Sequence, residues 1–202
     1  MQVYLDNSAT TRPCPQAVEA VAKSMTEAFH NPSALYAPAM RAEHALADAR
    51  RAIAATLGAQ EKNVIFTSGG TESDNLAIWG RLAAMHHPGE VLYTAAEHEA
   101  VKNACLEAQT RYGVVAREIP LLSSGTVDLT ALEGMLGPQT ALICVMQVCN
   151  ETGVIMPVKE ICGLRDRLAP QAAIHVDGVQ GYLRVPFSFK ETKADSYALS
   201  AH

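Results

Sequence analysis

An acidic side chain directly follows an apolar segment near the end of the chain. Residues 172–176 predict a buried strand, Asp177 comes next, and Gln180 lies three residues further on. A buried carboxylate without a partner is costly, and a protonated ring nitrogen of a ligand would be such a partner. Gln180 could reach a second polar atom of the same ligand. The alternative role of Asp177 is only to cap the next turn. His175 points to the opposite side of the strand from its neighbours and is expected to be structural.

A glycine-rich segment, residues 67–75, joins a predicted strand to a predicted helix. Its glycines allow the backbone to approach a ligand closely, and the hydroxyls of Ser68 and Thr71 can join the first helical amides in binding an anion. The segment is neither a Walker loop, because no lysine follows the glycines, nor a GxGxxG motif. It is a candidate phosphate site, and the alternative is an ordinary turn with a Ser or Thr cap.

Two further polar side chains follow predicted strands. His98 starts a helix, where the helix dipole disfavours a charged imidazolium, so a neutral ring could stack on a planar ligand. Asn150 follows the apolar run 140–148 and could bind a carboxylate or a phenolic oxygen. The alternatives are a surface histidine at position 98 and a polar turn that is tightest at Gly153.

Helical segments alternate with short apolar runs along the whole chain, without repeats or linkers. This rhythm predicts an α/β fold, with a mostly parallel sheet covered by helices on both faces. Ligands of such sheets bind at the carboxyl ends of the strands, where all of these candidate residues fall. The expected helices are 15–28, 36–57 (ended by Gly58), 75–86, 98–112, 128–136 (capped by Asp128 or Thr130) and 158–168, and the expected strands are 63–67, 91–95, 113–118, 140–148, 172–176 and 196–200.

The composition excludes several classes of protein. The 202 residues are 49% hydrophobic and 18% charged, which excludes a disordered chain, and the net charge of -5 without a basic run argues against binding nucleic acid or anionic membranes. No segment predicts a membrane span or a secretory signal. The five cysteines form no CxxC pair, so we expect free thiols, no metal site and a cytoplasmic location.

Taken together, the motifs resemble those of the NifS/IscS-like cysteine desulfurases in the class V aminotransferase family. The resemblance covers essentially the whole chain, and the order of the motifs is more specific than any one of them. The motifs are YLDNSATT at 4–11, HNPS at 30–33, FTSGGTESDN at 66–75, Glu97-His98, Asn150-Glu151, HVD at 175–177 with Gln180, and SAH at 200–202.

The resemblance implies a homodimeric fold-type I enzyme that binds pyridoxal 5'-phosphate (PLP). Such enzymes convert L-cysteine to L-alanine and pass the sulfur, through a cysteine persulfide, to an acceptor or scaffold protein for iron–sulfur cluster assembly or other sulfur delivery. Residues 15–202 would form the PLP-binding large domain, which is incomplete, and residues 1–14 would associate with the C-terminal small domain, before which the chain stops.

The resemblance also implies roles for individual residues. Gly70, Thr71, Ser200 and His202 would contact the phosphate, and His98 would stack on the pyridine ring and could serve as an acid or base. Asp177 would pair with the ring nitrogen, and Gln180 and Asn150 would lie near the phenolic oxygen. The implied substrate contacts come from Asn31 and Asn150.

The chain departs from the family pattern at its end. The lysine that forms the Schiff base with PLP is expected directly after His202, and the nucleophilic cysteine and the substrate-clamping arginine are expected beyond it. None of the five cysteines matches that nucleophile; Cys149 stands where relatives usually have asparagine. We therefore expect the 202 residues alone to be inactive. The alternatives are another class V enzyme, such as a selenocysteine lyase or an aminotransferase, and a non-catalytic PLP-binding fragment.

Overall fold

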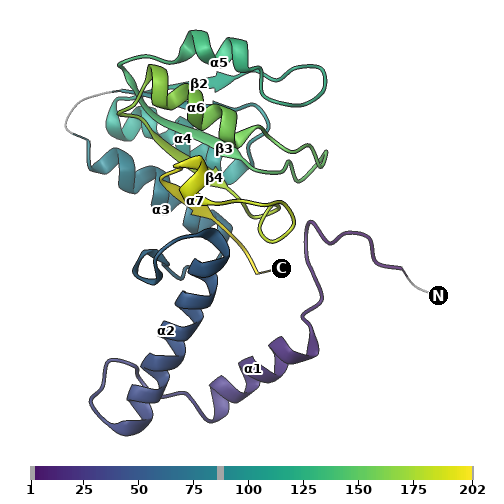
Figure 1. Ribbon diagram of the computed structural model, residues 1–202, viewed down its shortest axis with the longest axis vertical. Coiled ribbons are helices and arrows are strands. Elements are labelled where there is room, and N and C mark those ends of the chain that lie inside the picture. Colours follow the sequence, from purple (N-terminus) through teal and green to yellow (C-terminus); the bar gives the residue numbers. More distant parts are fainter. Residues whose placement is uncertain (1–2, 86–88, 202) are drawn as a thin grey trace. The chain divides into compact units, whose positions relative to one another are not determined.

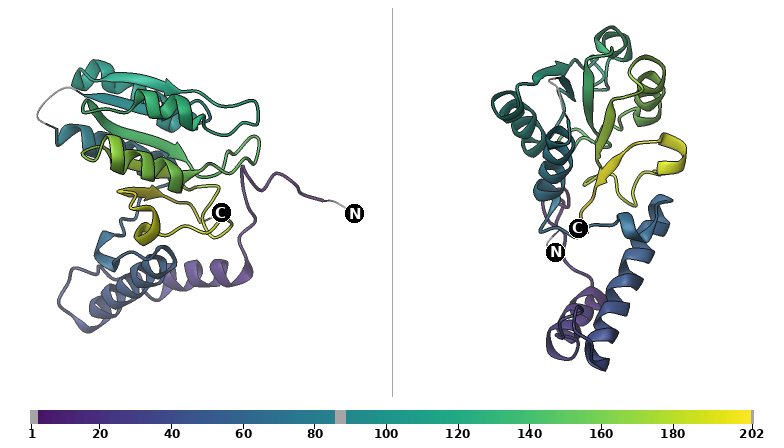
Figure 2. Two further views of the ribbon diagram at one scale, coloured as in Figure 1. Left: turned by 45° about the horizontal axis from the view of Figure 1, so that its top comes forward. Right: turned by 90° about the vertical axis from the view of Figure 1, so that its left-hand side faces the viewer.

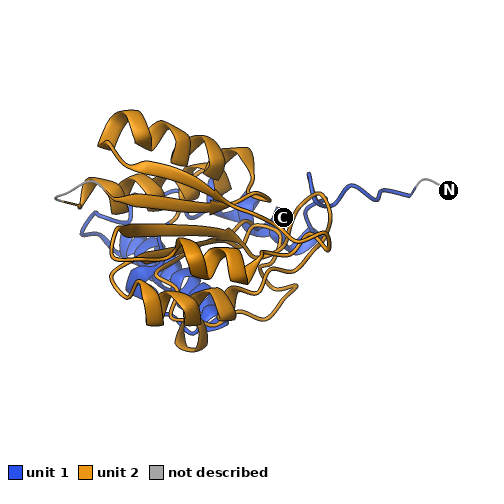
Figure 3. Cartoon of the chain, turned by 90° about the horizontal axis from the view of Figure 1, so that it is seen from above, with its two compact units in different colours: residues 1–65, 201–202 blue, residues 66–200 orange. Residues whose placement is uncertain are grey.

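The computed structural model describes residues 3–85 and 89–201. The chain forms two compact units, residues 1–65 with 201–202 and residues 66–200 (Figure 3). These units differ from the predicted division into a segment 1–14, associated with a C-terminal small domain, and a large domain 15–202. That division stays a prediction.

The larger unit is built on one parallel sheet. The strand order is β2-β1-β3-β4-β5, and every neighbouring pair is parallel. The carboxyl ends of all five strands therefore lie at one edge, where Met146, Asp177 and Ala198 are neighbours in register. The strands are β1 (Glu90–Thr94), β2 (Val115–Ile119), β3 (Thr140–Met146), β4 (Ala173–Asp177) and β5 (Ser196–Ala198).

Helices cover both faces of this sheet, as predicted (Figures 1 and 2). The side chains of α3 and α4 pack with alternate residues of β1 and β3 in one core cluster. Those of α5 and α6 pack on the other face, against the remaining residues of β1, β3 and β4. The helices of this unit are α3 (Gly70–Ala83), α4 (Glu99–Tyr112), α5 (Leu129–Met135), α6 (Val158–Leu168) and the short α7 (Phe189–Thr192).

The smaller unit contains two helices, α1 (Pro15–Thr26) and α2 (Ala37–Leu57), and the short 3-10 helix η1 (Glu61–Asn63). The predicted stop of α2 is confirmed, because Gly58 adopts the left-handed conformation with φ of 64°. Arg51 of α2 forms an ion pair with Glu61 at 3.0 Å, and the side chain of Arg50 donates to the backbone oxygen of Val64 at 3.3 Å. These contacts hold η1 against the second half of α2.

One predicted strand, residues 63–67, is wrong. Asn63 ends η1, and residues 64–67 pair with no described strand. Ile65 is 69% exposed and Phe66 is 47% exposed. The apolar run has the composition of a strand, but a strand forms only beside a partner strand, and residues 64–67 are not part of the described five-stranded sheet.

The helix predicted from residue 75 begins five residues earlier, at Gly70. The Glu72 carboxylate accepts a hydrogen bond from the backbone N–H of Ser68 at 2.6 Å, and the hydroxyl of Thr67 lies 2.7 Å from that of Ser73. These contacts, together with the favourable position of an acid in the first turn, stabilise a helix start that the two glycines obscure in the sequence. The predicted last residue, His86, lies outside the described residues.

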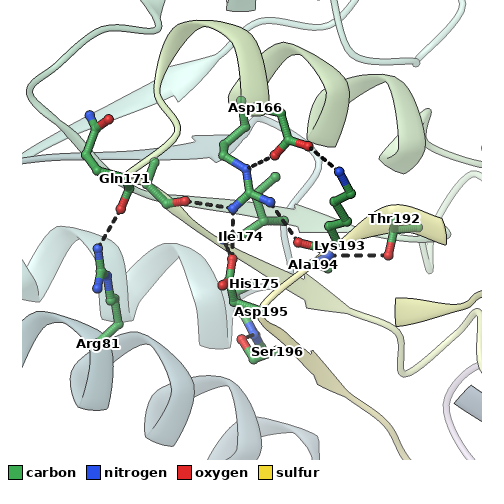
Figure 4. Close-up of polar contacts among 12 residues, drawn as sticks. Arg81, Asp166, Gln171, Ile174, His175, Thr192, Lys193, Ala194, Asp195 and Ser196 are labelled. Carbon is green, nitrogen blue, oxygen red and sulfur yellow. Dashed lines mark hydrogen bonds and ion pairs between the residues drawn. The ribbon is translucent and has the colours of Figure 1, made fainter. Parts of the chain in front are cut away.

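An arginine network fixes the amino ends of β4 and β5, opposite the carboxyl edge (Figure 4). Arg165 of α6 is only 5% exposed and donates to the backbone oxygens of Ala172 and Lys193 and to the carboxylate of Asp195. The same Asp195 oxygen accepts the backbone N–H of Ile174 at 2.7 Å. The network thus joins α6, β4 and the segment that enters β5.

The cap of α5 gives a first prediction. The Asp128 carboxylate accepts the backbone N–H of Ala131 at 3.0 Å, so Asp128 and not Thr130 is the cap. We expect Asp128→Ala to lower the free energy of unfolding by about 1 kcal/mol, because the first turn loses a hydrogen bond. The exposed Thr130→Ala is the matched control and should change it by less than about 0.5 kcal/mol. Urea denaturation monitored by circular dichroism measures both; equal effects would contradict the cap.

No helix in the described part of the chain is both long enough and apolar enough to cross a membrane.

Candidate functional site

Asp177 is the last residue of β4 and is 6% exposed. One carboxylate oxygen, Oδ1, accepts the backbone N–H of Val179 at 2.9 Å, so Asp177 does cap the following turn. The pKa of Asp177 is raised to about 6, mainly by burial and in smaller part by the nearby Asp74, against the Val179 hydrogen bond and the neighbouring His175 and His98. A cationic partner at this edge would favour the ionised carboxylate. The site is therefore suited to a protonated ring nitrogen.

His98 is the N-cap of α4, which confirms the predicted helix start. Its ring is exposed, and its Nδ1 accepts the backbone N–H of Ala100 at 3.1 Å. This hydrogen bond requires an unprotonated Nδ1, which is the arrangement in a neutral ring with its proton on Nε2. His98 follows the carboxyl end of β1 and Asp177 ends β4, so both residues belong to the same edge of the sheet.

The amino end of α3 lies beside the turn that follows Asp177. A Cβ atom added at Gly70 would lie 2.8 Å from a side-chain carbon of Val179, so a larger residue at position 70 would require the turn to shift. The first amides of a helix have no partner within the helix, and they favour an anion. Gly70 and Thr71 thus form the first turn of α3, not a separate loop before it, and this turn is close to Asp177.

Glu72 shares this helix start and is fully exposed. The hydroxyl and backbone N–H of Ser68 lower the pKa of Glu72. Its carboxylate accepts the hydrogen bond of the Ser68 amide. The amides of Gly70 and Thr71 are therefore the candidates at this helix start for binding a phosphate.

Asn150 and Gln180 lie on two turns at the same carboxyl edge. Asn150 is exposed in a tight turn closed by the bond from Gly153 N–H to the Cys149 oxygen at 2.8 Å. Gly153 has φ of 73°, as expected for the tightest point of the turn. Gln180 is half-buried, and its backbone oxygen accepts a hydrogen bond from Arg184 at 3.1 Å. Their ligand contacts stay predictions.

The remaining predicted residues are less closely tied to this edge. Ser200 lies two residues after β5, in the larger unit. Asn31 is an exposed residue of the smaller unit, and its side-chain oxygen accepts the backbone N–H of Ser33 at 3.0 Å. His202 lies outside the described residues.

A clamp holds the loop that carries Gln180. The Tyr197 hydroxyl donates to the side-chain oxygen of Gln147 at 2.5 Å, and the Gln147 amide group donates to the backbone oxygens of Val185 and Pro186. The ring of Tyr197 lies so close to Gly178 that a Cβ atom at position 178 would overlap it. The residue after Asp177 is therefore restricted to glycine unless the ring moves.

Sequence reasoning missed the role of Asp74. Its carboxylate lies 3.1 Å from Nε2 of His175, and Nδ1 of His175 lies 2.9 Å from the hydroxyl of Ser196. Asp74 and His175 are both about 1% exposed, and His175 does point away from its neighbours in β4, as predicted. The signal was the spacing of Asp74 with Ile78 and Leu82, which places all three on the buried face of α3.

Glu97, directly before His98, is the second residue that was missed. Only 8% of it is exposed, and its Oε1 accepts hydrogen bonds from the Thr94 hydroxyl at 2.6 Å and from the backbone N–H of Met146 at 2.7 Å. Glu97 lies in a short polar segment of the sequence, and this pattern does not predict its burial between the ends of β1 and β3.

The buried thiols are poor nucleophiles. The sulfur atoms of Cys105 and Cys144 lie 3.8 Å apart, and this contact together with burial raises the pKa of Cys144. Burial raises the pKa of Cys162 to about 11. Cys144 and Cys162 therefore stay protonated at neutral pH and suit packing more than catalysis.

The parallel sheet, with polar residues gathered at its carboxyl edge beside a helix start, has the architecture of α/β domains, whose ligands bind at this edge. Residues 3–202 match the family model described as aminotransferase class-V, and the chain therefore belongs to this family. A curated cysteine desulfurase from Cereibacter sphaeroides is 39% identical over 202 residues, which are 100% of this chain and 52% of that protein.

Solved structures give the same result for the fold. A structure described as a NifS-like protein has a TM-score of 0.93 and 30% identity, over 100% of this chain and 55% of that one. A structure described as SspA in complex with cysteine has a TM-score of 0.90 and 29% identity, over 98% of this chain and 57% of that one. The chain thus spans about half the length of the curated relatives it matches.

Proposed function

We propose that this chain carries the cofactor-binding part of a PLP-dependent cysteine desulfurase. The observation that carries the proposal is the position of Asp177, a buried carboxylate at the carboxyl edge of the sheet, next to the amino end of α3. The similarity to curated cysteine desulfurases supports the choice of reaction within the class V family. The activity, substrate and partners of the whole protein belong to the same proposal.

The residues at this edge fit PLP. The ring nitrogen requires an acid, for which Asp177 is available, and the phosphate requires amides and hydroxyls, which the Gly70–Thr71 turn and Ser200 can supply. His202, which lies outside the described residues, is proposed as a further phosphate contact from the family resemblance alone. The exposed ring of His98 can cover one face of the pyridine ring. Gln180 and Asn150, which lie on turns at this edge, are proposed to contact the phenolic oxygen through their side-chain amides.

PLP, when bound, withdraws electrons from the α-carbon of an amino-acid substrate. The residues at the carboxyl edge then have distinct proposed roles. Asp177 would accept the N–H of the ring nitrogen and so favour its protonated form, and the bond from Val179 fixes the orientation of the carboxylate. The bond from Ala100 fixes the ring of His98 and holds the proton on its Nε2. The clamp around Gln147 and Tyr197 restricts the motion of the loop that carries Gln180.

The proposed substrate is L-cysteine, the ligand present in one of the similar solved structures. Asn31 and Asn150 are proposed to contact it. We further propose that the whole protein is a homodimer that passes sulfur to an acceptor or scaffold protein for iron–sulfur cluster assembly. We also propose a cytoplasmic location, on the basis of the five cysteines, which form no CxxC pair in the sequence.

Product analysis of the full-length gene product tests this proposal. With L-cysteine, PLP and dithiothreitol, which reduces persulfide sulfur to sulfide, we expect alanine and sulfide in equal amounts. Formation of a keto acid in place of alanine would identify an aminotransferase. Turnover of selenocysteine without turnover of cysteine would identify a selenocysteine lyase, and either result would overturn the proposed reaction.

A further inference from the structure

Glu97 connects two strand ends at the candidate site. It lies in the loop between β1 and α4, and its backbone N–H donates to the Thr94 oxygen at 3.1 Å. Its Oε1 accepts the Thr94 hydroxyl, at the end of β1, and the backbone N–H of Met146, at the end of β3. Met146 is the register neighbour of Asp177. One side chain therefore joins the loop that carries His98 to the strand next to Asp177.

The second oxygen of Glu97 is buried without a hydrogen-bond partner among the described residues. A carboxylate with one desolvated, unpaired oxygen is costly, whereas a carboxylic acid can place its proton there and still accept two bonds at Oε1. The pKa of Glu97 is raised to about 8, mainly by burial and in smaller part by the charges of Asp177 and Asp74, against the bonds from Thr94 and Met146. Glu97 is therefore mainly a neutral acid at pH 7.

The neutrality of Glu97 matters because other titratable groups face the same edge. Asp177 lies at the end of β4, and Asp74 reaches the sheet from α3, where His175 contacts it. Like charges in such a site disfavour each other's ionisation. A neutral Glu97 can tie the loop to β3 without adding a third negative charge beside Asp177 and Asp74.

We propose that Glu97 is a positioning residue that fixes His98 relative to Asp177, through its hydrogen bond to the backbone of Met146. The proposal rests on the proposed function, in which His98 covers the ring and Asp177 binds the ring nitrogen. Glu97 itself need not touch the cofactor. Its carboxyl group sets the position of the loop whose next residue is His98.

Three variants separate positioning from other roles. Glu97→Gln keeps a neutral side chain of the same length with an oxygen that can accept both bonds, so it should preserve the site. Glu97→Ala leaves the Met146 N–H and the Thr94 hydroxyl without their acceptor and should release the loop. Asp128→Ala, which removes the cap of α5 on the opposite face of the sheet, is a control for destabilisation alone.

The probe is pyridoxamine 5'-phosphate, which lacks the aldehyde and cannot react with lysines, and its binding is measured by calorimetry. We expect Glu97→Ala to weaken binding by about tenfold or more, the equivalent of one lost buried hydrogen bond. Glu97→Gln should bind within about threefold of the unsubstituted protein, and Asp128→Ala should bind as the unsubstituted protein does. Equal affinities for Glu97→Ala and the unsubstituted protein would overturn the proposal.

A second readout needs no ligand. The Ala100 amide donates to Nδ1 of His98, so its resonance in a 1H–15N NMR spectrum reports the position of that ring. It should shift in Glu97→Ala and return in Glu97→Gln. If it shifts as expected while even the unsubstituted protein fails to bind the probe, the proposed function is wrong and the positioning role stands. If it does not shift, the positioning role is wrong.

Glu97→Asp serves if Glu97→Ala does not fold. The carboxyl group of aspartate is one methylene shorter, so it keeps the acid but cannot keep the bonds to both Thr94 and Met146 without moving the loop. It should show the same loss of affinity and the same shift of the Ala100 resonance. Behaviour identical to the unsubstituted protein would overturn the proposal in this case too.

Discussion

Asp177→Asn is expected to stabilise the ligand-free protein at neutral pH while it weakens the binding of PLP analogues. Burial raises the pKa of Asp177 from 3.8 to about 6, so the folded state binds this proton more tightly than the unfolded state. The stability of the folded protein therefore falls as the pH rises from about 4 to 6, and the full cost remains above pH 6. A rise of about two pKa units corresponds to about 3 kcal/mol.

Asparagine removes this cost and keeps an oxygen for the Val179 N–H. We expect a gain of about 2 to 3 kcal/mol in the free energy of unfolding at pH 7.5, and little gain near pH 4. The same change removes a charged hydrogen-bond partner of the ring nitrogen. The affinity for pyridoxamine 5'-phosphate should fall by about 10- to 150-fold, the equivalent of 1.5 to 3 kcal/mol.

Urea denaturation of the ligand-free protein at pH 4.5 and pH 7.5 measures the stability change, and calorimetry measures the affinity. Asp48→Asn is the matched control, because the side chain of Asp48 is 70% exposed and pairs only at the surface with Arg51. It should alter stability by less than about 1 kcal/mol at either pH. A gain for Asp177→Asn that is the same at both pH values would contradict the account of this carboxylate.

Arg165→Ala is expected to cause the largest loss of stability. The substitution leaves the Ala172 and Lys193 oxygens without their donor and removes the partner of Asp195. Removing one member of a buried ion pair costs about 3 to 5 kcal/mol, but Asp195 is 51% exposed and water compensates in part. We therefore expect a loss of about 2 to 4 kcal/mol in the free energy of unfolding.

Arg167→Ala is the control for Arg165→Ala. Arg167 lies on the same helix, its side chain is 65% exposed, and its ion pair with Glu133 is 3.5 Å long. Its removal should change stability by less than about 0.5 kcal/mol. Urea midpoints at pH 7.5 compare the two, and similar midpoints would show that the Arg165 network does not stabilise β4 and β5.

The helices and the central strands were predictable because their patterns are local. The bounds of α6 match the predicted 158–168, and Gly58 ends α2 as expected. The strand predicted at 63–67 failed because a strand also depends on a partner that its own residues do not specify. The start of α3 was missed because Gly69 and Gly70 indicate a turn, whereas the bond between Ser68 and Glu72 forms only in the folded helix.

The placement of candidate residues such as Asp177 at the carboxyl edge was predictable from the rule on parallel strands, but their polar contacts were not. The contact of His175 with Asp74 joins residues 101 positions apart, and the bond of Glu97 to Met146 spans 49 positions. Such pairs depend on the register of the sheet and on the rotation of α3. The raised pKa of Asp177 follows from the same long-range arrangement.

The central claim is that the carboxyl edge of this sheet binds the ring and phosphate of PLP. The most direct measurement is a 1H–15N NMR titration of the protein with pyridoxamine 5'-phosphate, with pyridoxamine as the control that lacks the phosphate. We predict saturable shifts at Thr71, Ala100, Val179 and Gln180, and much weaker binding of pyridoxamine. Shifts confined to other parts of the chain, or none at millimolar ligand, would contradict the account.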